Sequence, residues 1–255
     1  MDRERFDALC RSGDAAPDGG IGTLGEKRLH QLLKLYFEPR AACREQPCAG
    51  FVADILNEDG ITEVQTRNYF ALQRKLAVFL PLGPVRVVLP LPARKWVCWI
   101  DPDTGELSPR HLSPKRGCAF DAFYELQHIA PLLGAPGLTL DLLLFDADEL
   151  RLRDGWGGGG KRGSTRFELR PLALVSEQLL RTPADYAALL PAALPPQFTA
   201  AELMRAAKRS EALCRRALYT LEKAGALRRA GKRGRALLYE RVPKPCPAAP
   251  GGASS

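Results

Sequence analysis

The feature that most constrains the fold is a predicted β-hairpin between Gly50 and Arg67, with the sequence GFVADILNEDGITEVQTR. The apolar run 51–56 contains one acid and is followed by turn-forming residues at 57–60. The Asp-Gly pair that ends this turn is a strong hairpin signal. The next run, 61–66, alternates in character as a second strand does. The sequence therefore predicts two antiparallel strands joined by a tight turn.

The register of this hairpin decides which polar side chains meet. A four-residue loop pairs Leu56 with Ile61. That register puts Asp54 directly opposite Glu63. A two-residue turn at the Asp-Gly pair would place Asp54 opposite Gln65 instead. Side chains alternate along a strand, so Asp54, Glu63 and Gln65 share one face in both registers, whereas a one-residue slip would separate them.

Two carboxylates that face each other across a hairpin repel and destabilise it. Burial makes them costlier unless a positive charge lies between them. A Mg²⁺ ion supplies that charge, since it typically binds one or two carboxylates together with phosphate oxygens. The pattern at Asp54 and Glu63 thus has two interpretations: a metal-dependent phosphoryl-transfer site, or an acidic face exposed to solvent.

The order of these residues resembles the restriction-endonuclease-like (PD-(D/E)XK) nucleases. That superfamily has a helix carrying an acid, a hairpin carrying Asp and Glu-x-Lys, and then a helix and further strands. The resemblance covers roughly residues 20 to 150. It implies that Asp54, Glu63 and the backbone carbonyl of Val64 hold Mg²⁺ or Mn²⁺. It also implies a catalytic role for Glu26 on the preceding helix and for Gln65, which takes the place of the superfamily's lysine.

Two residues depart from the superfamily pattern. Ala53 replaces the proline before the Asp, and Gln65 replaces the lysine. A glutamine can orient a water molecule but carries no charge. In this superfamily a lysine on the following helix sometimes substitutes, which makes Lys75 the catalytic candidate here. The alternatives remain that Lys75 lies on a solvated helix face and that Glu26 is only a capping partner.

The rest of the N-terminal region alternates between helix and strand patterns, which predicts an α/β domain with a mixed central sheet of the restriction-endonuclease-like type. The predicted helices and strands are a helix after Thr23, a helix at 69–79, strands at 85–89 and 95–100, a helix from Phe120 to near Pro131, strands at 138–145 and 167–180, and a short helix at 185–190.

The segment Gln197–Val242 holds much of the positive charge. It contains twelve Lys or Arg and four Asp or Glu, a balance of +8, which equals the net charge of the whole chain. Its pattern of helix, turn, helix and basic hairpin resembles the winged-helix family, which implies duplex DNA as the partner. Docking to another protein is the alternative use of such a domain. The residues expected to contact DNA are Arg215, Arg216, Tyr219, Arg229, Lys232, Arg233 and Arg235.

Composition narrows the remaining classes. No apolar run approaches the ~18 residues of a membrane span. The N-terminal sequence is polar and acidic, unlike a secretory signal. The seven cysteines are scattered, which disfavours a zinc site or a disulfide framework and suits a cytoplasmic protein. The expected organisation is a flexible arm (1–20), a nuclease-like α/β domain (21–190), a linker (191–196), a winged helix (197–242) and a disordered tail (243–255).

Taken together, these patterns predict a Mg²⁺-dependent nuclease that a winged helix targets to DNA. The competing hypothesis is a non-catalytic DNA-binding regulator built on a degenerate nuclease fold. The loss of the lysine at Gln65 favours the second hypothesis. A basic side chain that reaches Asp54 and Glu63 would favour the first.

Overall fold

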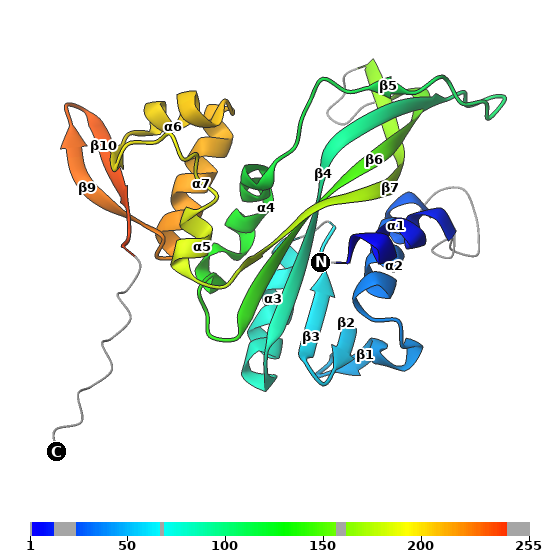
Figure 1. The fold of residues 1–255 in the computed structure, drawn as a ribbon, viewed down its shortest axis with the longest axis horizontal. Coiled ribbons are helices and arrows are strands. Elements are labelled where there is room, and N and C mark those ends of the chain that lie inside the picture. Colours follow the sequence, from blue (N-terminus) through cyan, green and yellow to red (C-terminus); the bar gives the residue numbers. More distant parts are fainter. Residues whose placement is uncertain (1, 13–23, 67–68, 157–161, 244–255) are drawn as a thin grey trace.

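The structure is a computed structural model that describes residues 2–12, 24–66, 69–156 and 162–243. The side chains of 24–27, 153–156 and 162–165 are outside the described part, as is the predicted tail from residue 244 onward. Within these limits the chain forms a large mixed β-sheet with helices on both faces (Figure 1), so the predicted mixed α/β architecture is confirmed.

The main sheet has seven strands in the order β1-β2-β3-β4-β6-β7, with β5 paired to β4. The β1-β2-β3 region is antiparallel, β3, β4 and β6 are mutually parallel, and β7 returns antiparallel to β6. The strands are β1 (Arg44–Cys48), β2 (Phe51–Asn57), β3 (Gly60–Val64), β4 (Val85–Ile100), β5 (His111–Leu112), β6 (Leu138–Trp156) and β7 (Arg162–Leu180).

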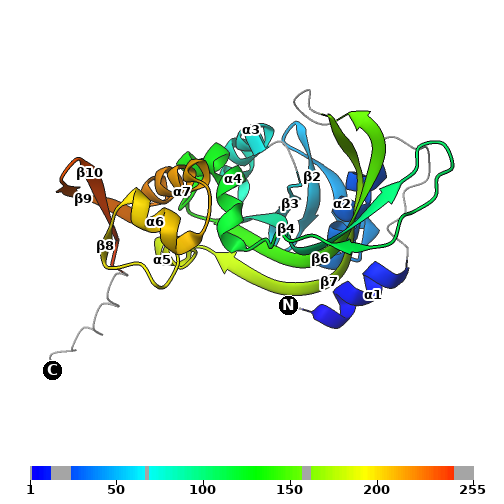
Figure 2. The same cartoon turned by 90° about the horizontal axis from the view of Figure 1, so that it is seen from above.

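Helices cover the two faces of this sheet with separate groups of buried side chains. On one face, α1 (Arg3–Ser12) and α2 (Leu24–Phe37) pack against apolar residues of β3, β4, β6 and β7. On the other face lie α3 (Tyr69–Phe79) and α4 (Phe123–Leu126), with short 3₁₀ turns before and after α4. Figure 2 shows α1 and α3 on opposite sides of the sheet. The hairpin β2–β3 therefore lies between α2 and α3.

The structure differs from the sequence expectations in the N-terminal arm and in the strands. Residues 3–12, within the predicted loose arm, form α1, because Phe6 is fully buried between α2 and the sheet. Strand β1 is absent from the predicted elements, since it is polar and contains Pro47. It is an edge strand, where a proline costs no ladder hydrogen bond toward a second neighbour. The two strands predicted over 85–100 are one bent strand, β4, with an irregular register between Pro92 and Arg94.

The C-terminal region is a small α/β unit with its own three-stranded sheet, in the order β8-β10-β9. Both of its longer helices begin at a capping residue: Thr199 and Glu202 form a capping box, and Ser210 accepts a hydrogen bond from the Leu213 amide. The elements are α5 (Pro183–Ala187), β8 (Gln197–Phe198), α6 (Ala200–Ala207), α7 (Glu211–Lys223), β9 (Leu227–Arg233) and β10 (Ala236–Arg241).

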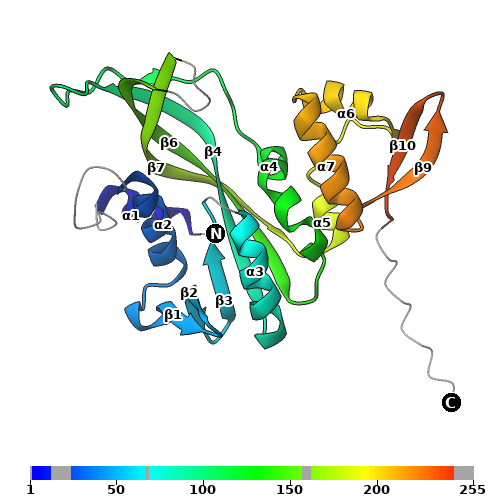
Figure 3. The ribbon, with the colours of Figure 1, turned by 180° about the vertical axis from the view of Figure 1, so that it is seen from behind.

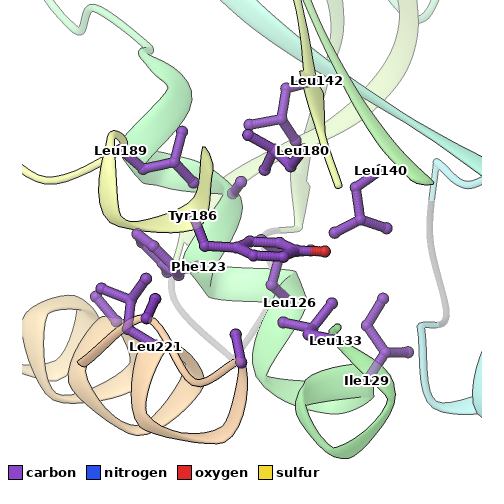
Figure 4. Packing of buried hydrophobic residues seen from close by; sticks show 14 of the residues in the cluster. Phe123, Leu126, Ile129, Leu133, Leu140, Leu142, Leu180, Tyr186, Leu189 and Leu221 are labelled. Atoms are coloured by element: carbon purple, nitrogen blue, oxygen red, sulfur yellow. The ribbon is translucent and has the colours of Figure 1, made fainter. Parts of the chain in front are cut away.

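This C-terminal unit shares a hydrophobic core with the main sheet. Tyr186 of α5 lies among side chains of α4, β6, β7 and α7 (Figure 4). Leu194, in the segment predicted as a linker, is buried as well. Arg209 also bridges the two regions through its ion pair with Asp121, at 2.7 Å. In Figure 3, α7 lies beside α4, and β9 and β10 project at the end of the molecule away from α1 and α2.

Candidate functional site

The β2–β3 hairpin has one of the two predicted registers. Leu56 pairs with Ile61, and Asn57 pairs with Gly60 across the turn. Gly60 has a φ of +113°, and a Cβ there would meet the Pro84 carbonyl oxygen at 2.4 Å, so the position requires glycine. This register brings Asp54 opposite Glu63, as the four-residue loop predicts.

The backbone pairing of β2 with β3 ends at Ile55 and Thr62. Beyond that point the side chains of the two acids accept hydrogen bonds from the backbone. The Val64 backbone N–H donates to Asp54 Oδ2 at 2.8 Å. The Asp54 N–H points in turn to Glu63 Oε1, at a longer 3.3 Å. Each carboxylate therefore satisfies a backbone N–H next to the other, at the point where β2 and β3 separate.

A basic or imidazole side chain reaches each acid from a different face of the sheet. Lys75 of α3 donates to Glu63 Oε2 at 2.7 Å and to the Val52 carbonyl at 2.8 Å. His30 of α2 places Nε2 3.1 Å from Asp54 Oδ2. The acids thus come together as predicted, but their outer contacts lie on opposite faces.

Burial and nearby charges shift the pKa values of the two acids in opposite directions. Glu63 is almost fully buried, which raises its pKa; the Asp54 charge raises it further, against the opposing effect of Lys75. Asp54 is also desolvated, but the contacts from His30 and the Val64 amide, together with the Lys75 charge, outweigh burial and lower its pKa. Asp54 is therefore the acid that holds a negative charge more firmly.

The other residues predicted to be catalytic are Glu26, Gln65 and Lys75. Glu26 belongs to α2, one turn before His30, but its side chain lies outside the described part. Gln65 follows β3 and is fixed through its backbone: its N–H donates to the Val88 carbonyl, and its carbonyl accepts from the Tyr69 hydroxyl. The predicted substitute, Lys75, is the basic side chain that reaches the acids.

The donor set limits how a metal could be held. Among the described residues, no group of three or more His, Cys, Asp or Glu side chains is arranged to bind a metal ion. Two carboxylates with water molecules and substrate oxygens are nevertheless the usual Mg²⁺ environment. Asp54 and Glu63 fit that pattern, with the Val64 carbonyl as the predicted third ligand. Lys75 now occupies one oxygen of Glu63.

Sequence reasoning missed a second acid–base pair beside this site. Lys34 lies one helical turn beyond His30 on α2, and its ammonium donates to Glu45 of β1 at 2.5 Å. The four-residue spacing of His30 and Lys34 was a usable signal, because such residues share a helix face. Glu45 gave no comparable signal, since its position depends on the unrecognised strand β1.

Some of the residues predicted to contact DNA are exposed on the C-terminal unit, and one is not. Arg215 and Tyr219 are exposed on α7, whereas Arg216 turns toward the main domain and stacks on Tyr124, 5.4 Å from the ring centroid. Arg215 and Tyr219 border a groove of about 720 Å³ between the two helices and the β9–β10 hairpin, and Arg235 lines its other side.

The β9–β10 hairpin carries four of the predicted DNA contacts, and two of these already have acidic partners. Arg229 pairs with Glu222 at 2.8 Å, and Arg233 pairs with Glu202 at 2.9 Å. Lys232 and Arg235 are exposed and form no ion pair with any acid in the described part of the chain. These two residues therefore offer the least compensated charge on the hairpin.

Comparison with known proteins places this chain in a family. Residues 27–181, more than half of the chain, match the family described as "Domain of unknown function (DUF8091)". The chain belongs to this family. The DUF8091 region runs from α2 to the end of β7, so it contains His30, Asp54, Glu63 and Lys75 and leaves out α1 and the C-terminal unit.

A relative extends the similarity beyond the DUF8091 region. A protein of Treponema pallidum (strain Nichols), described as uncharacterized, is 30% identical over 224 residues, which is 88% of each chain. No solved structure matches. In the described part of the chain, no helix is both long and apolar enough to cross a membrane.

Proposed function

We propose that this protein is a Mg²⁺- or Mn²⁺-dependent nuclease that hydrolyses phosphodiester bonds. The observation that carries the proposal is the position of Lys75, whose ammonium lies 2.7 Å from Glu63 beside Asp54. Gln65 cannot supply the positive charge that the superfamily's lysine supplies, and Lys75 can. The site thus combines two acids and a cation from three consecutive elements, β2, β3 and α3.

The connectivity around the site supports the same proposal. Helix α2 precedes the hairpin, α3 follows it, and β4 then runs parallel to β3. This order of a helix, a hairpin with Asp and Glu, a helix and a further strand is the one expected of restriction-endonuclease-like proteins. The match is one of element order, and the family comparison names no activity.

In the proposed mechanism the chain's own residues hold and orient the reactants. Asp54, Glu63 and the carbonyl of Val64 would bind the metal ion. When bound, the metal supplies a water of lowered pKa and stabilises charge on the phosphate. Lys75 would supply positive charge beside Glu63, while its contact with the Val52 carbonyl holds the ammonium in place. Gln65 orients the water, and His30 fixes the Asp54 carboxylate.

A cleavage assay with matched variants tests this function. Plasmid and single-stranded DNA should be cut with Mg²⁺ or Mn²⁺ and not with EDTA. Asp54→Ala, Glu63→Ala and Lys75→Met should each lower the rate by at least about 100-fold, as removal of one catalytic electrostatic group does in other enzymes. Arg74→Met is the control, because Arg74 is an exposed cation on the same helix. Metal-dependent cleavage that survives in Asp54→Ala and Glu63→Ala would disprove the site.

A non-catalytic DNA-binding regulator is the second candidate. The observation that favours it is that both carboxylates already have partners: Asp54 binds the Val64 amide and His30, and Glu63 binds Lys75. Thermal melts of wild type and Asp54→Asn in EDTA and in metal separate the two functions. A nuclease site should be stabilised by metal only in the wild type, by about 2.7 kcal/mol at a hundredfold Kd. Strong destabilisation of Asp54→Asn in EDTA, with no metal response, favours the regulator.

DNA is the proposed partner of the C-terminal unit in both candidates. Helix α6, helix α7 and the β9–β10 hairpin follow the order of the winged-helix family, and α7 exposes Arg215 and Tyr219. The local charge balance of +8 supports an anionic partner.

A further inference from the structure

Lys34 is a buried cation next to the candidate site. Its side chain is 2% exposed, so its ammonium is held away from bulk water. A buried ammonium is costly unless an anion compensates it. Among the described side chains, Glu45 is the one acid within ion-pair distance of Lys34. The charge of this buried lysine therefore depends on a single neighbouring carboxylate.

The Glu45 carboxylate is exposed to solvent. The Glu45 side chain is 60% exposed, although it touches a lysine that is almost fully buried. The carboxylate thus lies between the Lys34 ammonium and the solvent. If the Glu45 side chain rotated outward, another anion could take its place on Lys34 without leaving the ammonium uncompensated. In this pair the lysine is buried and the carboxylate is exposed.

The backbone at Glu45 adds a second observation. Glu45 has a φ of +55°, a left-handed conformation that is unfavourable for a residue with a Cβ. Its strand neighbours are regularly paired, Arg44 with Ile55 and Gln46 with Ala53. A single strained position inside a paired strand persists only where local contacts enforce it. The Lys34 contact is such an interaction, so displacement of the Glu45 carboxylate would allow this strain to relax.

The pair lies within electrostatic range of the proposed reaction site. Glu45 lies between Arg44 and Gln46, whose partners on β2 are the two neighbours of Asp54. The hydrogen bond and charge of Lys34 lower the pKa of Glu45, while the nearby Asp54 charge acts in the opposite direction. On α2, Lys34 lies one turn after His30, and His30 contacts Asp54. An anion bound to Lys34 would therefore lie near Asp54, on the face of the sheet that α2 covers.

We propose that Lys34 is a binding site for a phosphate group and that the Glu45 carboxylate occupies this site until the phosphate displaces it. The ligand class follows from the chemistry, because an ammonium binds a phosphate oxygen as it binds a carboxylate oxygen. The site itself stands without the nuclease. That the phosphate belongs to a nucleic-acid backbone rests on the proposed function.

The first measurement is phosphate binding by the full chain in EDTA, so that neither metal nor cleavage enters the result. Calorimetric titration with inorganic phosphate should show about tenfold tighter binding to Glu45→Ala than to wild type, the effect of one competing charge-assisted hydrogen bond. Glu58→Ala is the matched control. Glu58 is also exposed, at 68%, and lies in the adjacent hairpin, but its partner Arg40 is itself 52% exposed. Its removal should change the affinity by less than about twofold.

The second measurement assigns the effect to Lys34. In the Glu45→Ala background, Lys34→Met should abolish the gain while keeping the apolar stem. If the double variant does not fold, ¹³C-methylated lysines in Glu45→Ala report directly, since the Lys34 signal should shift on phosphate addition. Equal gains in Glu45→Ala and Glu58→Ala, a gain that survives Lys34→Met, or a Lys34 signal that ignores phosphate would each overturn the proposal.

A third arm distinguishes the source of the phosphate. A short single-stranded oligonucleotide that competes with inorganic phosphate and shifts the same Lys34 signal identifies a nucleic-acid backbone. Binding of inorganic phosphate alone supports the site and identifies a small phosphate ligand. Cleavage that is insensitive to Asp54→Ala, together with a Lys34 signal that responds to phosphate, would refute the nuclease and leave the phosphate site standing.

Discussion

Asp141 is a fully buried acid on β6. Arg86 lies 2.7 Å from its Oδ2 and also contacts Glu177 at 3.2 Å, so one guanidinium serves two carboxylates. Burial raises the pKa of Asp141 most strongly; Arg86 opposes this effect and Glu177 adds to it, which brings the value to about 7. The folded protein therefore favours a protonated Asp141 in conditions where the unfolded chain is ionised.

This shift predicts a pH-dependent cost that one substitution removes. Because the folded pKa exceeds the ordinary value, the folded state binds more protons, and the stabilising effect present at low pH is lost as pH rises toward about 7. Asp141→Asn mimics the protonated acid. It should raise the Tm more at pH 8 than at pH 5, because the cost builds up from the ordinary pKa of 3.8 to about 7. Thermal melts from pH 5 to pH 8 measure this, with Asp148→Asn as a more exposed control. A difference in Tm that does not vary with pH would contradict the assignment.

The β9–β10 hairpin should contribute to DNA binding unevenly along its length. Lys232 and Arg235 have no acidic partner among the described residues, whereas Arg229 and Arg233 share their charge with Glu222 and Glu202. Each phosphate contact contributes a slope of about −0.9 to log K against log salt. Lys232→Ala with Arg235→Ala should therefore flatten the slope by about two.

The paired arginines provide the comparison for this experiment. Arg229→Ala with Arg233→Ala should flatten the slope less, because their glutamate partners already neutralise part of the charge. Fluorescence anisotropy of a labelled duplex between 50 and 200 mM salt covers the range in which such contacts are visible. Equal losses in both double variants would mean that the ion pairs do not persist on DNA. A salt-independent affinity would favour protein docking.

Local signals explain which elements the sequence predicts correctly. The hairpin follows from its Asp-Gly turn and apolar strands, and α3 follows from the spacing of Leu72, Leu76 and Phe79. Strand β1 does not follow, because Glu45 adopts a left-handed φ and Pro47 is untypical of strands. The predicted break within β4 reflects its prolines, which the long parallel partner β6 overrides.

In the candidate site, too, residues that are close in sequence are predictable and residues brought together by the fold are not. Asp54 and Glu63 are close in sequence, so the turn between them is enough to predict that they meet. Lys75 was one of two cations on its helix, and the resemblance singled it out. The pair of Lys34 and Glu45 needs both the strand β1 and the strained Glu45 backbone, neither of which leaves a pattern in the sequence.

The shared core predicts that the sheet and the C-terminal unit unfold together. Leu221 of α7 is fully buried in the same cluster as Leu140 of β6. Leu221→Ala should lower the free energy of unfolding by about 2–5 kcal/mol. All three tryptophans precede the C-terminal unit in the sequence, so their fluorescence follows the main domain alone. In a cooperative molecule the tryptophan midpoint shifts with Leu221→Ala.

Leu237→Ala is the control for Leu221→Ala. Leu237 is 36% exposed on β10, outside the shared core, so Leu237→Ala should change the stability by less than Leu221→Ala does. The measurements are denaturant unfolding followed by tryptophan fluorescence and by circular dichroism. A tryptophan midpoint that stays at the wild-type value while circular dichroism shows an early transition would show that the two parts unfold separately.

Helix α1 is synthesised long before β7, the strand that it contacts. Arg3 donates to the Val175 carbonyl at 2.6 Å, and Asp7 accepts from the Leu174 amide at 3.1 Å. At ribosomal rates of 5–20 residues per second, α1 waits roughly 10–35 s for β7 to emerge. During that time Phe6, which α2 and the sheet later cover, has no complete binding surface. Until β7 emerges, the nascent chain therefore carries a polar helix whose buried residue, Phe6, is not yet fully covered.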